Sequence, residues 1–263
     1  MDIDSLMKIP GASLPRLQRL ATGKATPADQ AWACPWKFLL VEPDTWQKRV
    51  LCANDNLALC ATRQGGKTTI IAALVNWYLQ CCGKYVVVVS PSEEQSFEFA
   101  KRVLAQYDAL PLVGCSKRNA GSLKLENGAE MLALPCNEKT VRCRSAVDLL
   151  VMDEASRIPD SLYGAVRPML AVSKGRTVLL STPFGKRGFF YKACISDHWN
   201  KVFIPWHKCP RLTAEFIEEE RVEHGDLWIQ QEYECKFLNL ENCIFDPEEF
   251  RALIVKDTDV VYW

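Results

Sequence analysis

A glycine-rich run near residue 65 constrains the fold of this chain more than any other feature. Residues 60–69 read Cys-Ala-Thr-Arg-Gln-Gly-Gly-Lys-Thr-Thr, and Gly66-Lys67-Thr68 matches the second half of a phosphate-binding P-loop, Gly-x4-Gly-Lys-Ser/Thr. Ala61 stands where that motif has its first glycine. The run 56–61 is apolar and strand-like, and residues 69–82 have helical character. A strand, a glycine turn and a helix in this order predict a cradle for phosphate.

Each part of this loop has an expected role toward a nucleoside triphosphate such as ATP. Backbone N–H groups at the turn and at the positive end of the helix are expected to face the phosphates. These belong to Gln64, Gly65, Gly66, Lys67, Thr68 and Thr69. The Lys67 ammonium is expected to reach the β- and γ-phosphates, and the Thr68 hydroxyl to bind Mg²⁺. The alternative is a chance Gly-Gly-Lys-Thr turn without a ligand.

An acidic doublet at the end of an apolar run supplies the second motif. Residues 147–154 read Val-Asp-Leu-Leu-Val-Met-Asp-Glu, which is typical of a buried parallel strand followed by two carboxylates. Ligands collect at the carboxyl ends of such strands. We expect Asp153 to hold Mg²⁺ and Glu154 to act as the general base that orients and deprotonates the attacking water. The alternative is an acidic pair that only caps the end of the strand, and the presence of a P-loop in the same chain makes the catalytic interpretation the better one.

Three other short segments are candidates for nucleotide contacts. The Gln47 amide can hydrogen-bond both edges of adenine, with Trp46 packed nearby, although a surface turn leading into a helix also explains this segment. Arg63 can place its guanidinium on the γ-phosphate, or be a solvated loop arginine. Ser181 and Thr182 end a strand before Pro183 and can report hydrolysis, or simply terminate the strand.

Arginines upstream of the acidic doublet are candidates for a finger that acts on a neighbouring subunit. Arg142, with Arg144 as the other candidate, precedes the doublet, and such a residue stabilises charge in the phosphoryl-transfer transition state. A local salt bridge is an equally good explanation for either residue. The basic pairs Lys117-Arg118 and Lys186-Arg187, placed in predicted loops, are candidate contacts for a nucleic acid backbone, or solvated charges.

The overall composition excludes several classes of protein. The 32 basic and 32 acidic residues cancel, so DNA binding requires local patches or several subunits lining one channel. No stretch approaches 18 apolar residues, so we expect no membrane span. The N-terminus carries no continuous apolar segment of the kind that a signal peptide has. The twelve cysteines form no C-x-x-C pair, which favours reduced, mostly buried thiols in a cytoplasmic protein over a zinc site around His207 and Cys209.

Strand and helix patterns alternate along the chain. We expect strands at 56–61, 85–90, 149–153, 176–182 and 201–205, a hairpin of 122–125 with 129–134, and helices at 67–82, 91–107, 162–170, 189–194, 213–223 and 226–235. Such alternation predicts an α/β fold with a mostly parallel central sheet flanked by helices. With the two motifs, this is the P-loop NTPase fold of the additional-strand, catalytic-glutamate class, carrying a β-hairpin insertion. We expect an N-terminal arm over 1–35, an ATPase domain over 36–243 and a linker or tail over 244–263.

Taken together, these motifs resemble the ATPase domain of the large subunit of tailed-phage terminases. The resemblance covers about residues 40–250 and rests on matching segments rather than on one motif. These are Trp46-Gln47, Ala61 to Thr68, Ser90-Pro91, Val151 to Ala155, Ser181 to Gly185, Gln231 to Phe237 and Ile244 to Pro247.

The resemblance implies ATP hydrolysis coupled to translocation of double-stranded DNA. It implies a homo-oligomeric ring, usually of five subunits, whose isolated chain can be a monomer. It also implies a portal ring and a small terminase subunit as partners, in the host cytoplasm. It also implies that Thr182 lies in the coupling motif. Large terminases usually carry a nuclease domain with metal-binding carboxylates; Asp257 and Asp259 in the tail are too few for a two-metal site, so no nuclease activity is predicted for these residues.

Two other functions are compatible with the same nucleotide chemistry. A superfamily-2-like helicase or remodelling ATPase fragment would normally bring a second motor domain with its own arginine finger, and no such domain is visible in these residues. A nucleotide-binding structural subunit that does not hydrolyse ATP would have no need for a water-activating base such as Glu154.

Overall fold

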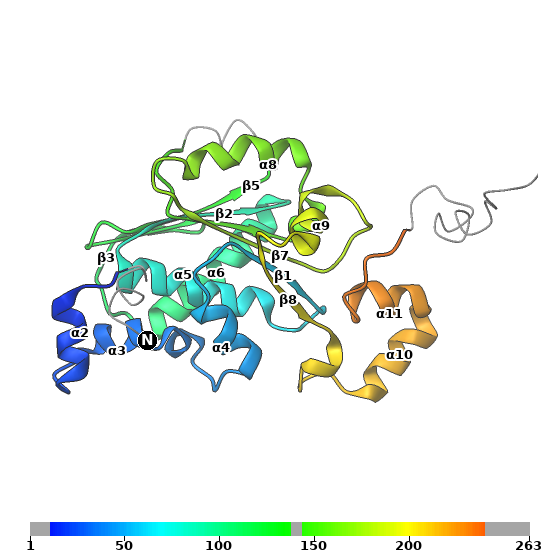
Figure 1. Ribbon diagram of the computed structural model, residues 1–263, viewed down its shortest axis with the longest axis horizontal. Coiled ribbons are helices and arrows are strands. Elements are labelled where there is room, and N and C mark those ends of the chain that lie inside the picture. Colours follow the sequence, from blue (N-terminus) through cyan, green and yellow to red (C-terminus); the bar gives the residue numbers. More distant parts are fainter. Residues whose placement is uncertain (1–10, 138–143, 240–263) are drawn as a thin grey trace, which may run out of the picture.

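The computed structural model describes residues 11–137 and 144–239, and these form an eight-stranded sheet with helices on both faces (Figure 1). The strands are β1 (Leu57–Ala61), β2 (Tyr85–Ser90), β3 (Cys115–Asn119), β4 (Ser122–Leu125), β5 (Glu130–Pro135), β6 (Leu149–Asp153), β7 (Arg176–Ser181) and β8 (Asn200–Ile204). The α-helices are α2 (Leu14–Ala21), α3 (Pro27–Ala33), α4 (Thr45–Cys52), α5 (Lys67–Cys82), α6 (Glu93–Ala109), α8 (Asp160–Val166), α9 (Gly188–Ile195), α10 (Ala214–His224) and α11 (Asp226–Glu232). Short 3₁₀ helices are η1 (Pro35–Leu39), η2 (Ala155–Arg157), η3 (Arg167–Leu170) and η4 (Trp206–Lys208).

The order of the strands determines where the two motifs meet. It is β3-β4-β5-β2-β6-β7-β1-β8, with parallel pairing from β5 to β8 and antiparallel pairing among β3, β4 and β5. The strand of the acidic doublet, β6, is therefore separated from the P-loop strand, β1, by the single strand β7. All three strands end at the same edge of the sheet, so the predicted phosphate, metal and coupling residues converge there.

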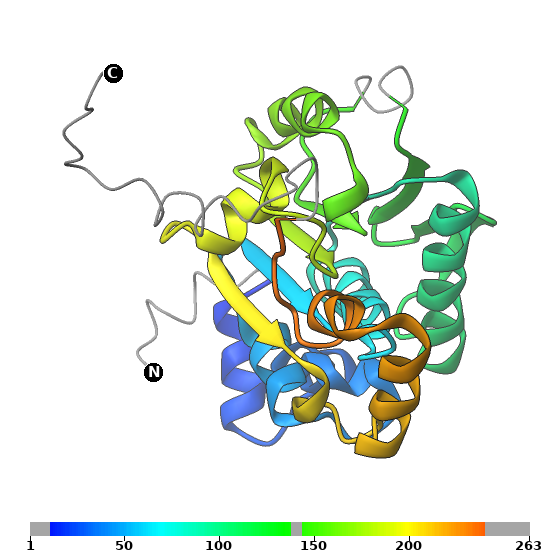
Figure 2. The ribbon, with the colours of Figure 1, turned by 90° about the vertical axis from the view of Figure 1, so that its right-hand side faces the viewer.

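Two hydrophobic layers hold the sheet. Helices α5 and α6, together with α3, α4 and η1, cover one face, and α8 and α9 cover the other (Figure 1). The central strands β1, β6 and β7 are buried along their whole length, as their continuous apolar runs require of strands covered on both faces. A smaller cluster of Ile217, Ile229 and Tyr233 joins α10 to α11, which lie together beside the end of β8 (Figure 2).

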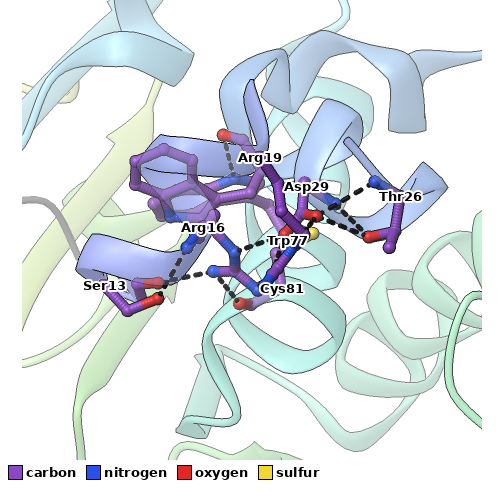
Figure 3. Close-up of polar contacts among 9 residues, drawn as sticks. Ser13, Arg16, Arg19, Thr26, Asp29, Trp77 and Cys81 are labelled. Atoms are coloured by element: carbon purple, nitrogen blue, oxygen red, sulfur yellow. Dashed lines mark hydrogen bonds and ion pairs between the residues drawn. The ribbon is translucent and has the colours of Figure 1, made fainter. Parts of the chain in front are cut away.

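A buried carboxylate holds the N-terminal helices in place. Asp29 of α3 is only 1% exposed and accepts hydrogen bonds from Arg16 at 3.1 Å and from Arg19 at 2.7 Å, both on α2 (Figure 3). The Arg16 guanidinium also donates to the Cys81 carbonyl at 2.9 Å, which attaches α2 to the end of α5. The Arg19 guanidinium, with backbone and side-chain donors of Thr26, holds the pKa of Asp29 well below its usual range.

The expected strands and most of the expected helices are confirmed, and the differences have local causes. The helix expected over 162–170 is α8 followed by η3, since Pro168 has no N–H to continue the α-helical ladder. The last helix ends at Glu232 rather than at Cys235, and Gly225 occupies the cap position assigned to Asp226. Lys117 and Arg118 were expected in a loop but lie on edge strand β3.

Several predictions concern residues outside the described ranges. They include Arg142, the segment 244–247 and the two tail carboxylates Asp257 and Asp259. The domain boundaries expected at 35/36 and 243/244 stay predictions. Within the described part of the chain, no helix has both the length and the apolar character needed to cross a membrane.

Candidate active site

The P-loop links the end of β1 to the start of α5. Gly66 caps α5 with φ +85°, a left-handed conformation that glycine adopts without strain. The Thr62 N–H donates to a β8 carbonyl at 2.9 Å, and the Arg63 N–H donates to a carbonyl at the end of α11, also at 2.9 Å. The loop is thus anchored from two sides. The first N–H groups of α5, beginning at Lys67, have no partner within the helix and form an anion-binding terminus.

The structure brings the two sequence motifs into direct contact. Lys67 Nζ lies 3.1 Å from Glu154 Oε1, although the two residues are far apart in the chain. The Ser181 hydroxyl, at the end of the intervening strand β7, donates to Glu154 Oε2 at 3.2 Å. Ser181 and Ser156 hydroxyls lie 2.7 Å apart. Each carboxylate oxygen of Glu154 therefore has a partner, one a cation and one a hydroxyl.

Asp153 is a buried carboxylate that lacks sufficient counter-charge. It is 6% exposed and accepts the Glu154 N–H at 3.1 Å. Burial first, and then repulsion by the Glu154 carboxylate, raise the pKa of Asp153 to about 7, while Lys67 acts in the opposite direction. A divalent cation at this position would supply the missing positive charge.

The donor set around Asp153 fits magnesium. Carboxylate and hydroxyl oxygens are the hard ligands that Mg²⁺ prefers, and Thr68 brings its hydroxyl at the first turn of α5. The buried Ser90 hydroxyl, one residue beyond the paired Val89 and Met152, has no hydrogen-bond partner among the described residues. A buried hydroxyl of this kind, close to a buried carboxylate, could hydrogen-bond a water molecule bound to the metal ion.

A cavity of about 380 Å³ opens between the P-loop, the acidic doublet and α11. Its lining is polar and includes five of the residues singled out from the sequence. These five are Arg63, Gln64, Lys67, Glu154 and Thr182. The remaining lining residues are Pro91, Gln95, Arg157 and Glu232. The other candidates, Gln47, Trp46, Gly65, Gly66, Thr68, Thr69, Asp153 and Ser181, lie outside this lining.

The two adenine candidates occupy different surroundings on α4. Gln47 lies beside the P-loop, since a side-chain carbon built on Gly66 would come within 3.8 Å of its Nε2. Its Oε1 accepts the Asp44 N–H at 2.9 Å in the cap of α4, which leaves the Nε2 hydrogens for a ligand. Trp46 is half-buried and packs against the main hydrophobic core.

The candidate arginines also differ in position. The Arg63 guanidinium lies over the Trp228 ring, 5.6 Å from its centroid, and Arg63 is part of the cavity lining. Arg144 is exposed and lies near Tyr85, where its charge opposes the effect of burial that raises the tyrosine's pKa. Tyr85 begins β2, so Arg144 belongs to the opposite edge of the sheet from the cavity.

Sequence reasoning missed three charged residues at the site. Arg157 follows Glu154 in the same turn, and this proximity was the one available signal. Glu232 comes from α11, and Arg211, which donates to the Gly65 carbonyl at 3.1 Å, comes from the loop before α10. Nothing local in the sequence connects either of them with the P-loop.

Comparisons with known proteins concern the family and the fold of this chain. The family model described as the terminase large subunit, T4likevirus-type, N-terminal, matches residues 59–252. No curated protein matches the chain significantly. The ATPase domain of the Thermus phage P74-26 large terminase superposes with a TM-score of 0.67 at 20% identity, covering 77% of this chain and 97% of that one. The bacteriophage HK97 large terminase gives 0.61 at 15% identity, covering 75% and 51%.

A third solved structure, a large terminase from a thermophilic bacteriophage in complex with ATP-γ-S, gives a TM-score of 0.57 at 11% identity, covering 78% and 52%. This chain thus spans about half the length of the HK97 and thermophilic-phage proteins. At these identities the similarity concerns the fold, and it confirms the predicted P-loop NTPase architecture.

Proposed function

This chain belongs to the T4likevirus-type family of terminase large subunits, whose N-terminal part matches residues 59–252, and we propose that it hydrolyses ATP with Mg²⁺ to drive double-stranded DNA into a viral procapsid. The observation that carries the proposal is the 3.1 Å contact between Lys67 and Glu154 on the wall of one polar cavity. A lysine at a P-loop and a carboxylate at a strand end are the parts that phosphoryl transfer to water requires.

In the proposed reaction the ion pair between Lys67 and Glu154 opens when a triphosphate enters. The lysine then pairs with phosphate oxygens, and Glu154 becomes free to orient and deprotonate a water molecule. The Ser181 hydroxyl keeps the carboxylate aimed at the cavity through its 3.2 Å hydrogen bond. Thr68 and Asp153 would hold the Mg²⁺, which neutralises charge on the β- and γ-phosphates.

The remaining assignments follow the family. A relative bound to ATP-γ-S supports a nucleotide at the corresponding place in this chain. We assign Gln47 to the adenine and Thr182 to the segment that couples hydrolysis to movement. The working assembly is a ring, with five subunits expected and Arg142 as the candidate finger acting in trans, and its partners are DNA, a portal ring and a small subunit. It would act in the cytoplasm of an infected host.

Mg²⁺-dependent ATP turnover, measured with and without duplex DNA and portal-bearing procapsids, tests the proposal. Lys67→Ala is expected to abolish turnover, and Glu154→Gln is expected to retain ATP binding while losing hydrolysis. Lys84→Ala is the matched control, since that lysine pairs with Asp148 at 2.9 Å at the amino end of β2. Unchanged turnover in Lys67→Ala would remove the P-loop assignment.

Procapsids and a strand-separation substrate distinguish the biological roles. Turnover stimulated by procapsids, without separation of DNA strands, supports packaging. Strand separation without procapsid stimulation would identify a helicase instead. Tight nucleotide binding without any turnover would indicate a structural subunit.

A further inference from the structure

Arg157 faces the nucleotide cavity from the turn that follows the acidic doublet. Its backbone N–H donates to the Glu154 carbonyl at 2.9 Å, which closes the 3₁₀ turn η2. Its side chain lines the same cavity as Lys67, Glu154 and Thr182. None of the roles assigned so far uses this cation, although it is the basic residue nearest in the chain to the candidate base.

The Arg157 guanidinium lies against an aromatic ring and a carboxylate. Its Cζ lies 3.8 Å from the centroid of the Phe184 ring, and its Nη2 lies 3.8 Å from Glu232 Oε1. Within residues 11–137 and 144–239, the guanidinium has no hydrogen bond of its own. Because it carries five N–H donors in a planar fork, most of its binding capacity is available to a second anion.

The partner of Arg157 is a carboxylate that needs a counter-charge. Glu232, at the end of α11, is 3% exposed, and Gln231 Nε2 donates to its Oε1 at 3.0 Å. The Glu232 backbone carbonyl also accepts the N–H of Arg63, so the residue is fixed against the P-loop. A buried carboxylate retains its charge at a modest cost only while a cation stays close. Arg157 therefore pairs with a fixed anion in the lining of a cavity that is proposed to receive phosphate.

The position of Arg157 indicates which phosphate it would meet. P-loop N–H groups enclose the α- and β-phosphates, whereas the water-activating carboxylate lies beside the γ-phosphorus. Arg157 is in the same turn as Glu154 and on the same cavity wall. Arg63 is less suitable, since its guanidinium lies over the ring of Trp228, a residue that does not line the cavity.

We propose that Arg157 recognises the γ-phosphate by exchanging its ion pair with Glu232 for the terminal phosphate of a bound nucleoside triphosphate. A diphosphate leaves the Arg157–Glu232 pair as it is, so the exchange distinguishes ATP from ADP. Guanidinium and phosphate form two parallel charge-assisted hydrogen bonds, which the 3.8 Å pair with Glu232 does not provide. The inference rests on the proposed nucleotide site and adds a specificity-determining residue to it.

Equilibrium binding of ATP-γ-S and of ADP, each with Mg²⁺, tests the exchange in the full chain. Arg157→Ala is expected to weaken ATP-γ-S binding at least tenfold and to change ADP binding less than twofold. Arg157→Lys is expected to lie between the wild type and Arg157→Ala, because a lysine keeps the charge and loses the fork. Arg187→Ala is the matched control: its Cζ lies 5.4 Å from the same Phe184 ring, it does not line the cavity, and it is expected to leave both affinities unchanged.

A second variant tests the competing anion and excludes a purely structural role. Glu232→Gln removes the charge at nearly constant size and is expected to raise the ATP-γ-S affinity while leaving the ADP affinity alone. Equal weakening of both nucleotides in Arg157→Ala, no weakening of either, or a loss of ATP-γ-S affinity in Glu232→Gln would overturn the exchange while leaving the nucleotide site intact. A wild-type chain that binds neither nucleotide would instead overturn the proposed function itself.

Discussion

Removing the Ser181 hydroxyl is expected to disturb the candidate base without removing it. Ser181 is fully buried, and its single hydroxyl proton can go only to the Glu154 carboxylate, which accepts but does not donate. Ser156, 2.7 Å away, must then donate to Ser181. The two hydroxyls form a short chain of hydrogen bonds that ends on Glu154, and Ser181→Ala cuts the bond that orients it.

The size of the effect follows from the geometry of that bond. Hydrogen bonds to charged groups contribute about 1.5–3 kcal/mol. The 3.2 Å distance is longer than the usual O–H···O separation of about 2.7–2.8 Å, and the Glu154 side chain is 26% exposed, so the lower end of the range applies. Roughly 1.4 kcal/mol of lost positioning corresponds to about a tenfold decrease in kcat.

Steady-state ATP turnover, resolved into kcat and KM, checks this expectation. Ser181→Ala should decrease kcat with little change in KM, because the hydroxyl touches the base and not the nucleotide-binding loop. Ser156→Ala, which leaves the bond to Glu154 in place, should keep kcat within about twofold of the wild type. Wild-type kcat in Ser181→Ala, in a protein where Glu154→Gln is inactive, would refute the positioning role.

Two further predictions concern the stability of the fold. Asp29→Asn should lower the free energy of unfolding at pH 7 by about 1–3 kcal/mol. Because the pKa of Asp29 is depressed in the folded state, this loss of stability should be complete above the unfolded pKa of about 3.9 and should become smaller as the pH falls below it. Urea titrations of both proteins at pH 7 and at pH 3 measure the difference. A difference that stays constant across this range would contradict the ion-pair account. Gly175→Ala should destabilise the folded protein by at least about 2 kcal/mol, since its new carbon would lie 2.2 Å from the Val147 carbonyl oxygen. Gly164→Ala, which places a methyl group in open space on α8, should stabilise the folded protein by about 0.5–1 kcal/mol. Thermal unfolding measures both effects. Equal melting temperatures for the two glycine variants would refute the packing around Gly175.

The central layers of the fold could be predicted because their signals are local. The β-branched run 85–90 and the apolar run 149–153 each correspond to a strand with the expected ends, and Gly66 and Gly83 bound a helix of the expected length. Edge strand β3 and the N-terminal helices α2 and α3 could not be predicted in this way. Strand β3 is polar and exposed on every residue, and it exists because β4 supplies the pairing partner.

In the candidate site, too, residues in local motifs could be predicted and residues brought in by tertiary packing could not. Lys67, Glu154 and Thr182 stand in motifs whose spacing reflects the chemistry, and the structure brings all three to one cavity. Glu232 and Arg211 reach the P-loop only because α10 and α11 fold back against it, and that is a property of tertiary packing. The spacing of residues in the sequence does not indicate that α10 and α11 pack against the P-loop.

A crystal structure with Mg²⁺ and a nonhydrolysable ATP analogue tests the central claim most directly. We predict that the triphosphate occupies the cavity between the P-loop and the acidic doublet, with Lys67 moved from Glu154 onto the β- and γ-phosphates and the metal between Thr68 and Asp153. An analogue bound elsewhere, or a cavity that stays empty with the 3.1 Å lysine–glutamate pair unbroken at saturating analogue, would contradict the account.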